Sequence, residues 1–295
     1  MRQLGLVVHP TRPIEATLGE VEAWTSARGL ALGQVMIPGQ ERRVAEPVEP
    51  EACDLLLALG GDGTALAALH AGAPASRPVL AIACGSIGAL TSVGAKRVAW
   101  ALDQFASGHW TATAVPGLDL AWDAGSEEVA INDAIVIRDG PGQIVVSIAL
   151  DDAPYAQIAG DGVVVATALG SSAYTMAAGG PLLAPGAEGM VLTPLAAHGG
   201  VCPPLVAGGD SRLTLRIEMG YGGARCERDG HPTPIAGHML TVTHRPEYAI
   251  RVALAGEESR LTGLRRRGLI LDSPRALIRD RRSLVLHHVD DLEDA

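Results

Sequence analysis

Leu55-Leu-Leu-Ala-Leu-Gly-Gly-Asp-Gly-Thr64, followed by residues 65–70, is the stretch on which the fold depends. Residues 55–59 form a continuous apolar run, which is typical of a strand buried on both faces of a parallel sheet. Residues 65–70 are mostly good helix formers, so the glycine-rich segment 60–64 is expected to be the turn between a strand and a helix. Glycines let the backbone approach a ligand closely, and the amides of such a turn suit phosphate.

The carboxylate of Asp62 is unexpected in an anion-binding turn, because its negative charge repels phosphate. A base for a hydroxyl nucleophile or a contact with Mg²⁺ would explain it. A plain Asx turn at the end of a strand is the alternative that spacing alone leaves open. We therefore treat Asp62 as the candidate catalytic residue, and Gly60, Gly61, Gly63 and Thr64 as candidate nucleotide-binding residues.

Strand-like and helix-like patterns alternate through about the first hundred residues. The expected strands are residues 4–8, 55–59 and 79–83, and the expected helices are residues 13–28, 65–70 and 97–105. This alternation predicts an open parallel α/β sheet of the Rossmann-like type. Ligands of such sheets bind beyond the carboxyl ends of the strands. Segment 60–64 and a second glycine-bearing loop, residues 85–88, are both placed there.

The pattern changes after about residue 110 to short strands at close spacing. The candidates are residues 111–114, 118–122, 134–138, 143–150, 162–166, 213–217, 240–244 and 249–254. Turn residues such as Asp229-Gly230 separate them, which predicts a β-rich second domain of the β-sandwich kind. Residues 170–209 are dense in glycine and alanine, and we expect a tightly packed loop or short helices there.

These patterns divide the chain into two expected domains. The first is the α/β domain with the Gly-Gly-Asp-Gly-Thr loop, residues 1–110, and the second is a β-rich domain, residues 111–259. The tail, residues 260–295, returns to apolar runs, and we leave open whether it packs back on the first domain.

The charge balance excludes some classes of partner. The chain of 295 residues has a net charge of −10, and 47% of its residues are hydrophobic. A nucleic acid or an anionic membrane would require a basic face, so we expect neither partner. We find no run of 18 apolar residues free of charges or turn signals, and no signal-peptide pattern at the beginning of the sequence. We therefore expect a cytoplasmic protein.

Neither the cysteines nor the histidines follow a metal-binding pattern. The four cysteines, Cys53, Cys84, Cys202 and Cys226, are widely spread and form no Cys-x-x-Cys pair. The nine histidines show no His-Glu-x-x-His spacing. We expect reduced thiols and no metal site built from protein side chains alone.

Several motifs together resemble one family. The strand with Gly60–Thr64 is similar to the hallmark of NAD kinases, which diacylglycerol-type lipid kinases and, loosely, phosphofructokinases share. Residues 130–138 resemble the Asn-Glu/Asp motif of NAD kinases, residues 160–181 their long Gly-Asp-Gly segment, and residues 192–198 their Leu-Thr-Pro segment. Asp229-Gly230-His231 stands where that family has Asp-Gly-Gln or a variant. The motifs keep the family's order over nearly the whole chain.

The resemblance implies a phosphotransferase. Asp62 would accept the proton of the adenosine ribose 2′-hydroxyl of NAD, and that oxygen would attack the γ-phosphate of ATP to give NADP. Mg²⁺ would accompany ATP, and polyphosphate is an alternative donor. The resemblance also implies a homo-oligomer, either a dimer or a tetramer.

The resemblance further implies an NAD pocket. Asn132 and Asp133 would bind the ribose or the adenine, and Asp161 would meet the nicotinamide or its ribose. Each of these residues taken alone is better explained by a turn, and only their joint order favours a pocket. The other residues implied at the pocket are Ser172, Ala173, Tyr174, Ala177 and His231.

The sequence departs from the family pattern at several ligand positions. Polar, basic or aromatic residues of the family are replaced by Ala83, Ala89, Ala159 and Ala177. Each hydrogen bond lost at a buried site costs about 1–3 kcal/mol. We therefore keep two alternatives: a divergent kinase that phosphorylates another nucleotide or nucleoside, and a non-catalytic dinucleotide-binding protein. The intact Asp62 counts against the second, and the lack of a basic membrane face disfavours a lipid kinase.

Overall fold

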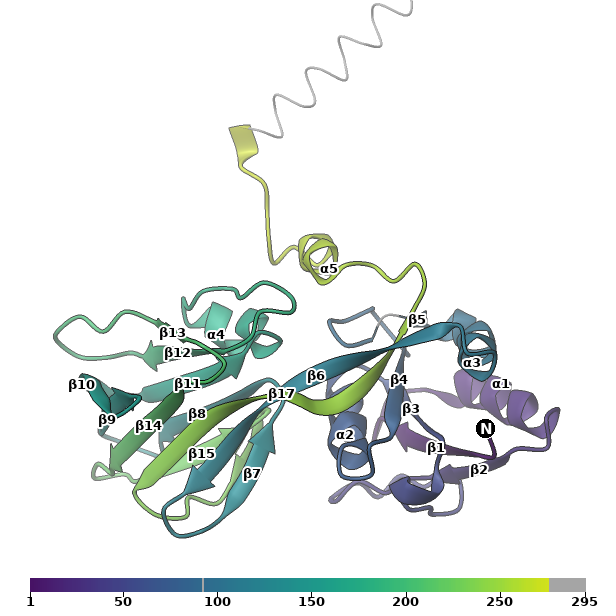
Figure 1. Ribbon diagram of the computed structural model, residues 1–295, viewed down its shortest axis with the longest axis horizontal. Coiled ribbons are helices and arrows are strands. Elements are labelled where there is room, and N and C mark those ends of the chain that lie inside the picture. The colour runs from purple at the N-terminus through teal and green to yellow at the C-terminus, as the bar shows by residue number, and fades with distance from the viewer. Residues whose placement is uncertain (92, 276–295) are drawn as a thin grey trace, which may run out of the picture. The chain divides into compact units, whose positions relative to one another are not determined.

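The computed structural model of the protein describes residues 1–91 and 93–275 (Figure 1). The chain divides into a large unit, residues 1–257, and a small unit that begins at residue 258. The small unit contains helix α5 (Arg260–Arg266), which Ser259 caps through a hydrogen bond from the amide of Thr262. The expected packing of the tail stays a prediction, since residues 276–295 lie outside the described part. No helix within the described ranges is long and apolar enough to span a bilayer.

The first half of the large unit is the parallel α/β sheet that the sequence predicts. Its strands β1 (Gln3–Val8), β2 (Ala31–Gln34), β3 (Leu55–Gly60) and β4 (Pro78–Ala83) lie in the order β2-β1-β3-β4. A two-residue strand, β5 (Val93–Gly94), pairs in parallel with the end of β4. Strand β2 was not predicted, because its sequence Ala-Leu-Gly-Gln is short and only half apolar.

Helices cover both faces of this sheet. The side chains of Leu4, Leu6 and Val8 join one buried cluster with helices α1 (Glu15–Ser26) and α3 (Val98–Ala106). Val7, from the other face of β1, joins a second cluster with helix α2 (Asp62–Gly72). Because successive side chains of a strand point to opposite faces, α2 covers the face that α1 and α3 leave. From β1 the chain continues to β2 on one side, and from β2 it crosses to β3 on the other side of β1. Ligands of such sheets bind at the carboxyl ends of the two strands where the order reverses, here β1 and β3.

Helix α2 begins three residues earlier than its composition predicts. We expected a turn over residues 60–64 and a helix from residue 65, but Asp62 is already the first residue of α2. The turn can be this tight because Gly60 has no side chain: a Cβ there would lie 2.1 Å from the Oγ1 atom of Thr64. Asp62 therefore belongs to the helix N-terminus rather than to a loop, and its carboxylate lies at the positive end of the helix dipole.

The second half of the large unit is a β-sandwich, as predicted. One layer contains β9 (Ile144–Leu150), β10 (Ala153–Gly160), β14 (Arg212–Glu218) and β7 (Glu127–Ala130) together with parts of two long strands. The other layer has the order β13-β12-β11-β8-β15-β16, with bounds Leu205–Ala207, Met190–Leu195, Gly162–Thr167, Asp133–Arg138, Ala224–Arg228 and His231–Thr233. Alternate side chains of both layers, such as Val146, Leu215, Val136 and Val163, form one buried cluster.

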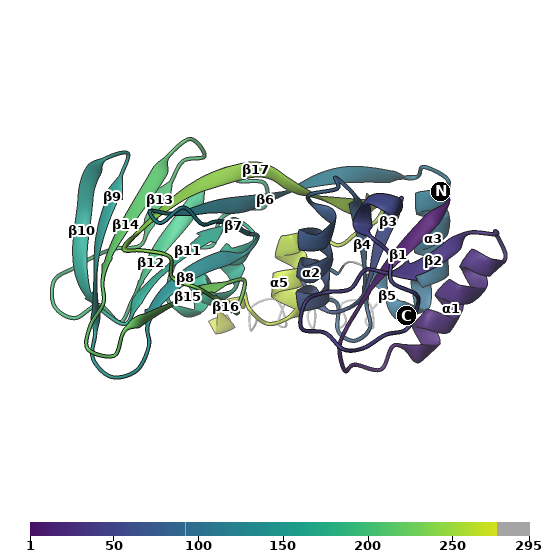
Figure 2. The same cartoon turned by 90° about the horizontal axis from the view of Figure 1, so that it is seen from below.

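Two long strands belong to both halves of the unit. Strands β6 (Trp110–Trp122) and β17 (Met239–Leu254) pair antiparallel along their length (Figure 2). We expected four short strands here, since Pro116 and Pro246 interrupt the patterns. The register shifts between Arg245 and Ala249, opposite Pro116. A bulge tolerates a residue without an amide hydrogen, so both prolines are accommodated and the strands continue. The domain limits near residue 110 stay a prediction.

The glycine- and alanine-rich stretch 170–209 is only partly the loop that we expected. It begins with a 3₁₀ turn, η3 (Gly170–Ser172), and one helical turn, α4 (Tyr174–Ala177). The expectation was wrong for Met190–Leu195, which is strand β12, and for Leu205–Ala207, which is the edge strand β13. Strand β12 pairs with β11 on one side and β13 on the other, and it is nearly all buried. We did not predict this strand of six residues, because glycine-rich segments flank it.

Two glycine substitutions test this packing. A Cβ on Gly162 would lie 2.0 Å from the carbonyl oxygen of Val136, and its φ of +151° is unfavourable for other residues. Gly162→Ala should therefore lower the free energy of unfolding by at least about 2–3 kcal/mol. Gly19→Ala is the matched control, because Gly19 lies within α1 with open space beside it, and it should stabilise by about 0.5–1 kcal/mol. Urea denaturation measures both, and equal effects would contradict the close approach at Gly162.

Candidate functional site

Arg12 lies over both glycine loops at the carboxyl ends of the parallel strands. It follows β1, and its Nη1 atom would be 3.3 Å from a Cβ on Gly61 and 2.8 Å from one on Gly85. No ion pair within residues 1–91 and 93–275 uses its guanidinium. A half-buried cation between two glycine-rich turns can bind an anion, together with the amides at the start of α2. The sequence analysis missed Arg12, although its place directly after the first strand of a Rossmann-like sheet could have indicated it.

The loop that carries Arg12 is held rigidly. Arg42 donates from Nη1 to the carbonyl oxygens of His9 (3.0 Å) and Arg12 (2.6 Å), and from Nη2 to Glu15 (2.7 Å). The Nδ1 atom of His9 accepts hydrogen bonds from the amides of Thr11 and Arg12. Burial and then the charges of Arg12 and Arg42 lower the pKa of His9. The loop is therefore a local positive centre in an acidic chain.

The carboxylate of Asp62 holds the second glycine loop. Its Oδ2 atom accepts from the amide of Ala89 (2.7 Å), and its Oδ1 atom accepts from the amides of Leu90 (2.9 Å) and Thr91 (3.3 Å). A Cβ on Gly88 would lie 2.1 Å from Oδ1, so only glycine fits there. An ionised carboxylate oxygen has two lone pairs, which leaves Oδ2 able to accept one further proton donor.

The other residues of the Gly-Gly-Asp-Gly-Thr motif have unequal positions. Gly61 lies beneath Arg12, and Gly63 is exposed with open space beside its Cα. Thr64 is buried and packs on Gly60. Gly61 and Gly63 are thus open to a ligand, whereas Gly60 and Thr64 shape the turn.

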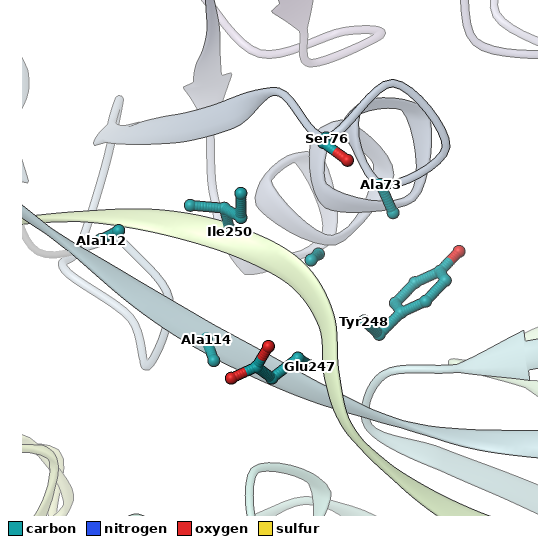
Figure 3. Close-up of a pocket in the computed structure, with 8 residues that line it drawn as sticks. Ala73, Ser76, Ala112, Ala114, Glu247, Tyr248 and Ile250 are labelled. Carbon is teal, nitrogen blue, oxygen red and sulfur yellow. The ribbon is translucent and has the colours of Figure 1, made fainter.

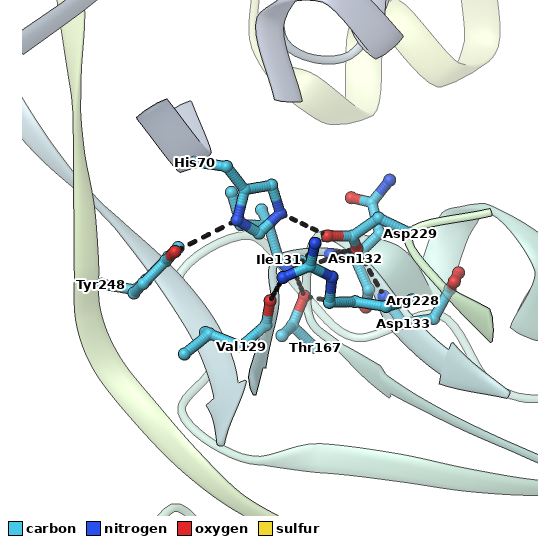
Figure 4. A network of polar contacts seen from close by, with 9 residues as sticks. All are labelled: His70, Val129, Ile131, Asn132, Asp133, Thr167, Arg228, Asp229 and Tyr248. Atoms are coloured by element: carbon cyan, nitrogen blue, oxygen red, sulfur yellow. Dashed lines mark hydrogen bonds and ion pairs between the residues drawn. The ribbon is translucent and has the colours of Figure 1, made fainter. Parts of the chain in front are cut away.

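A single buried carboxylate organises the segment Ile131–Asp133 (Figure 4). Asp229 accepts hydrogen bonds from three consecutive amides, those of Ile131 (2.9 Å), Asn132 (2.6 Å) and Asp133 (3.2 Å). The carbonyl oxygens of the segment also have donors. The Oγ1 atom of Thr167 donates to the carbonyl oxygen of Ile131 (2.7 Å), and the amide of Thr167 donates to the carbonyl oxygen of Asn132 (2.9 Å). The backbone of the Asn132-Asp133 motif is therefore fixed from both sides.

The hairpin between β15 and β16 explains why Asp229 can reach these amides. Arg228 pairs with His231, so Asp229-Gly230 is a two-residue loop, and both residues have positive φ (51° and 79°). This is the geometry of a type I′ turn, which Asp-Gly favours. Burial alone raises the pKa of Asp229, but the hydrogen bond from His70 and those from the amides of Ile131 and Asn132 outweigh it. The pKa of Asp229 therefore lies below its ordinary value.

Asp133 is a second buried carboxyl group, with only 5% of its surface exposed. Burial, followed by the nearby charges of Asp229 and Glu227, raises its pKa to about 7. Within the described part of the chain, no hydrogen bond uses the side chain of Asn132 or Asp133. Both side chains can therefore bind a ligand, and Asp133 can gain or lose a proton near neutral pH.

Helix α2 connects the glycine loop to this segment. Leu66 and Leu69 of α2 share a buried cluster with Ile131 and the neighbouring Leu169. His70, near the end of the same helix, bonds to Asp229 through Nε2 at 2.7 Å. The structure thus brings the Asp62 helix and the Asn132-Asp133 segment together. The sequence analysis named Asp229 as a turn residue and as part of a family motif without giving it a role, and it did not single out His70.

The remaining predicted site residues lie on the β-sandwich. Asp161 precedes β11 and pairs with Arg138, whose Nε lies 2.5 Å from Oδ1. His231 begins β16 and is exposed. Of the residues on η3 and α4, Ser172 is half-buried, while Ala173, Tyr174 and Ala177 are exposed. Their roles at an NAD pocket stay predictions.

One cavity, of about 370 Å³, is lined by residues outside the two glycine loops (Figure 3). Small residues such as Ala73 and Ala112 line it, together with Ser76, Glu247 and Tyr248. It contains neither Asp62 nor Asn132. Within residues 1–91 and 93–275, no group of three or more His, Cys, Asp or Glu side chains could hold a metal ion.

Comparisons with known families find matches in both halves. The model of the ATP-NAD kinase N-terminal domain matches residues 6–110, and that of the ATP-NAD kinase C-terminal domain matches residues 131–243. A NAD kinase of Chloroflexus aggregans is 34% identical over 140 residues, which are 46% of this chain and 50% of that protein. A NAD kinase of Nocardia farcinica is 48% identical over 58 residues, which are 20% of this chain and 18% of that protein. The chain thus matches at most about half the length of these relatives.

Two solved structures have the same fold. Yeast NADH kinase, solved with NADH, superposes with a TM-score of 0.76 over 90% of this chain and 86% of its own, at 22% identity. A NAD kinase of Archaeoglobus fulgidus, solved with ATP, superposes with a TM-score of 0.71 over 89% of this chain and 96% of its own, also at 22% identity. The two-part fold predicted from the sequence is therefore confirmed.

Replacing Asp133 with Asn should stabilise the protein above neutral pH. The pKa of this carboxyl in the folded protein, about 7, exceeds the unfolded value. Its contribution to stability is therefore fully present below about pH 4 and is lost as the pH rises through about 7. Asn escapes this loss, so the free energy of unfolding should exceed that of the wild type by on the order of 4 kcal/mol at about pH 8, and match it at about pH 4. Urea denaturation at both pH values tests this, and a difference independent of pH would exclude the charge as its cause.

Proposed function

We propose that this chain, which belongs to the NAD kinase family, transfers the γ-phosphoryl group of ATP to the adenosine ribose 2′-hydroxyl of NAD and so makes NADP. The observation that carries the proposal is the shared helix: Asp62 begins α2, and the Asn132-Asp133 segment packs against the same helix. The names of the matched relatives support this activity. A structural relative solved with ATP and another solved with NADH support the two ligands.

On the donor side, Arg12 and the amides at the start of α2 would hold the phosphates of ATP. The guanidinium lies between Gly61 and Gly85, so it can neutralise charge that develops on the transferred group. Phosphoryl transfer depends mainly on such positioning and neutralisation. Mg²⁺ would arrive with ATP and add positive charge at the phosphates. Polyphosphate would bind through the same groups.

On the acceptor side, Asn132 and Asp133 would bind the adenosine ribose of NAD. Their backbone is fixed by Asp229 and Thr167, while no hydrogen bond within the described residues uses their side chains. The remaining lone pair of Asp62 Oδ2 would take the proton of the 2′-hydroxyl as its oxygen attacks the γ-phosphate in line. The proton passes to the carboxylate, and ADP leaves with the electrons of the broken bond. Asp161, Tyr174 and the neighbouring residues 172–177 would complete the NAD pocket.

The proposal includes two properties of the whole protein. We expect a homo-oligomer, a dimer or tetramer, because the resemblance to NAD kinases implies one. We also expect the protein to act in the cytoplasm, where its two proposed substrates are available.

The central test is NADP formation from NAD, ATP and Mg²⁺, measured with a dehydrogenase that uses only NADP. Asp62→Asn should lower the rate about 10²–10⁴-fold, because the proton acceptor is lost, while calorimetry should show retained ATP binding. Asp152→Asn is the matched control: this aspartate lies in an exposed turn with a φ of +66°, which Asn tolerates, and activity should be unchanged. Undiminished turnover by Asp62→Asn would exclude the base assignment. A wild-type protein that makes no NADP would shift the proposal to another acceptor.

Arg12→Ala should weaken the donor site selectively. Loss of one charge-assisted contact predicts a KM for ATP raised about 10–100-fold, with the KM for NAD nearly unchanged. Arg12→Lys keeps the charge and should recover part of the loss. Arg43→Ala removes only an exposed pair with Glu46 and serves as control. A rise in the KM for NAD alone would place Arg12 at the acceptor instead.

A further inference from the structure

We propose that His70 is a positioning residue for the phosphoryl transfer, and that it acts through Asp229 to hold the Asn132-Asp133 backbone in place against helix α2. The inference rests on the proposed function. It assigns a role to three side chains, His70, Asp229 and Tyr248, which we call the α2 clamp (Figure 4).

The carboxylate of Asp229 has two kinds of partner on opposite sides. Three consecutive amides of Ile131–Asp133 donate to it from the β-sandwich, and His70 Nε2 lies 2.7 Å from Oδ2 on the side of α2. Only 4% of the Asp229 side chain is exposed, so water cannot readily replace a missing partner. A change in the position of His70 should therefore move the carboxylate and, with it, the backbone of Ile131–Asp133, which we call the acceptor segment.

His70 and Asp62 share one rigid element. They are eight residues apart on α2, which corresponds to about 12 Å along the helix axis. The histidine thus ties the acceptor segment to the helix whose first residue is the proposed base. An error of about 1 Å in such an arrangement can cost about 100-fold in rate.

Tyr248 fixes the orientation of the histidine ring. Its hydroxyl lies 3.1 Å from His70 Nδ1, and the two rings meet edge to face with centroids 5.6 Å apart. An ionised carboxylate only accepts, so Nε2 must carry the proton shared with Asp229, and in the neutral ring Nδ1 then accepts from the hydroxyl of Tyr248. Tyr248 lies in the bulge of β17, where residues 246–248 have no partner in β6. The bulge therefore aims a side chain at α2.

A positioning role of the clamp and a purely stabilising role predict different kinetic constants. If the clamp positions the acceptor, its loss should affect kcat and the KM for NAD but not the KM for ATP, because Arg12 and the glycine loops are untouched. If the contacts serve only to stabilise the fold, kinetic constants measured well below the melting temperature should stay unchanged.

The test compares His70→Phe, which keeps a ring but has no donor, with His70→Gln, whose amide can still donate to Asp229. His70→Phe should lower kcat about 10–100-fold with less than about a twofold change in the KM for ATP. His70→Gln should restore most of the loss, and Tyr248→Phe should cost less than His70→Phe. His109→Gln, at an exposed position outside the clamp, should behave as the wild type. Unchanged kinetics in a folded His70→Phe variant would overturn the proposal.

Hydrogen exchange separates failure of the clamp from failure of the proposed function. The amides of Ile131, Asn132 and Asp133 should exchange at least about 10-fold faster in His70→Phe than in the wild type, and at the wild-type rate in His70→Gln. Amides of β9, which pairs with β10 and β14 and not with the Ile131–Asp133 segment, provide the internal reference. This readout needs no NADP formation, so it remains decisive if the wild type prefers another acceptor. Equal exchange of the three amides in His70→Phe and wild type would refute the clamp.

Discussion

The buried carboxylate of Asp229 is the interaction on which the proposed site depends. It satisfies three successive amides that would otherwise be buried without partners, and it does so from a two-residue hairpin turn. Such a cluster of donors is stable only around a negative charge, which the lowered pKa of Asp229 ensures at neutral pH. Burial, and after it the charge of Asp229, raises the pKa of Asp133 and so favours its uncharged form. A single aspartate thus fixes the backbone of residues 131–133 and contributes to the raised pKa of Asp133.

The proposed donor site contains a positive charge, although the chain as a whole is acidic. A protein with a net charge of −10 repels nucleotides at long range, so binding must depend on local groups. Arg12, fixed by Arg42 through its own carbonyl oxygen, supplies a cation where two glycine turns expose their amides. The carboxylate of Asp62 is already stabilised by hydrogen bonds from the amides of residues 89–91. The repulsion that makes an aspartate unexpected in such a turn is thereby reduced.

The sequence predicted the elements that leave a local pattern of apolar and turn residues. It missed those that depend on contacts between residues far apart in the chain. The apolar run 55–59 was sufficient to predict its strand, because burial on both faces leaves a local pattern. Strand β12 was missed because its buried residues stand between glycine-rich loops. Asn132 and Asp133 were found through a family resemblance. His70 was not, because a histidine at the end of a helix has no local signal: its partner is 159 residues away.

The pairing of β17 with β4 has a consequence for the order in which the chain can fold. During synthesis, β4 is complete once residue 83 has emerged, but its edge at Pro78 and Val79 meets Ile250 and Arg251. This edge of the parallel sheet therefore stays uncovered until more than half of the polypeptide has been synthesised after β4. Contacts so distant in sequence slow folding. An uncovered strand edge invites pairing with other chains. The nascent chain should accordingly depend on chaperones most strongly in the interval before β17 is made.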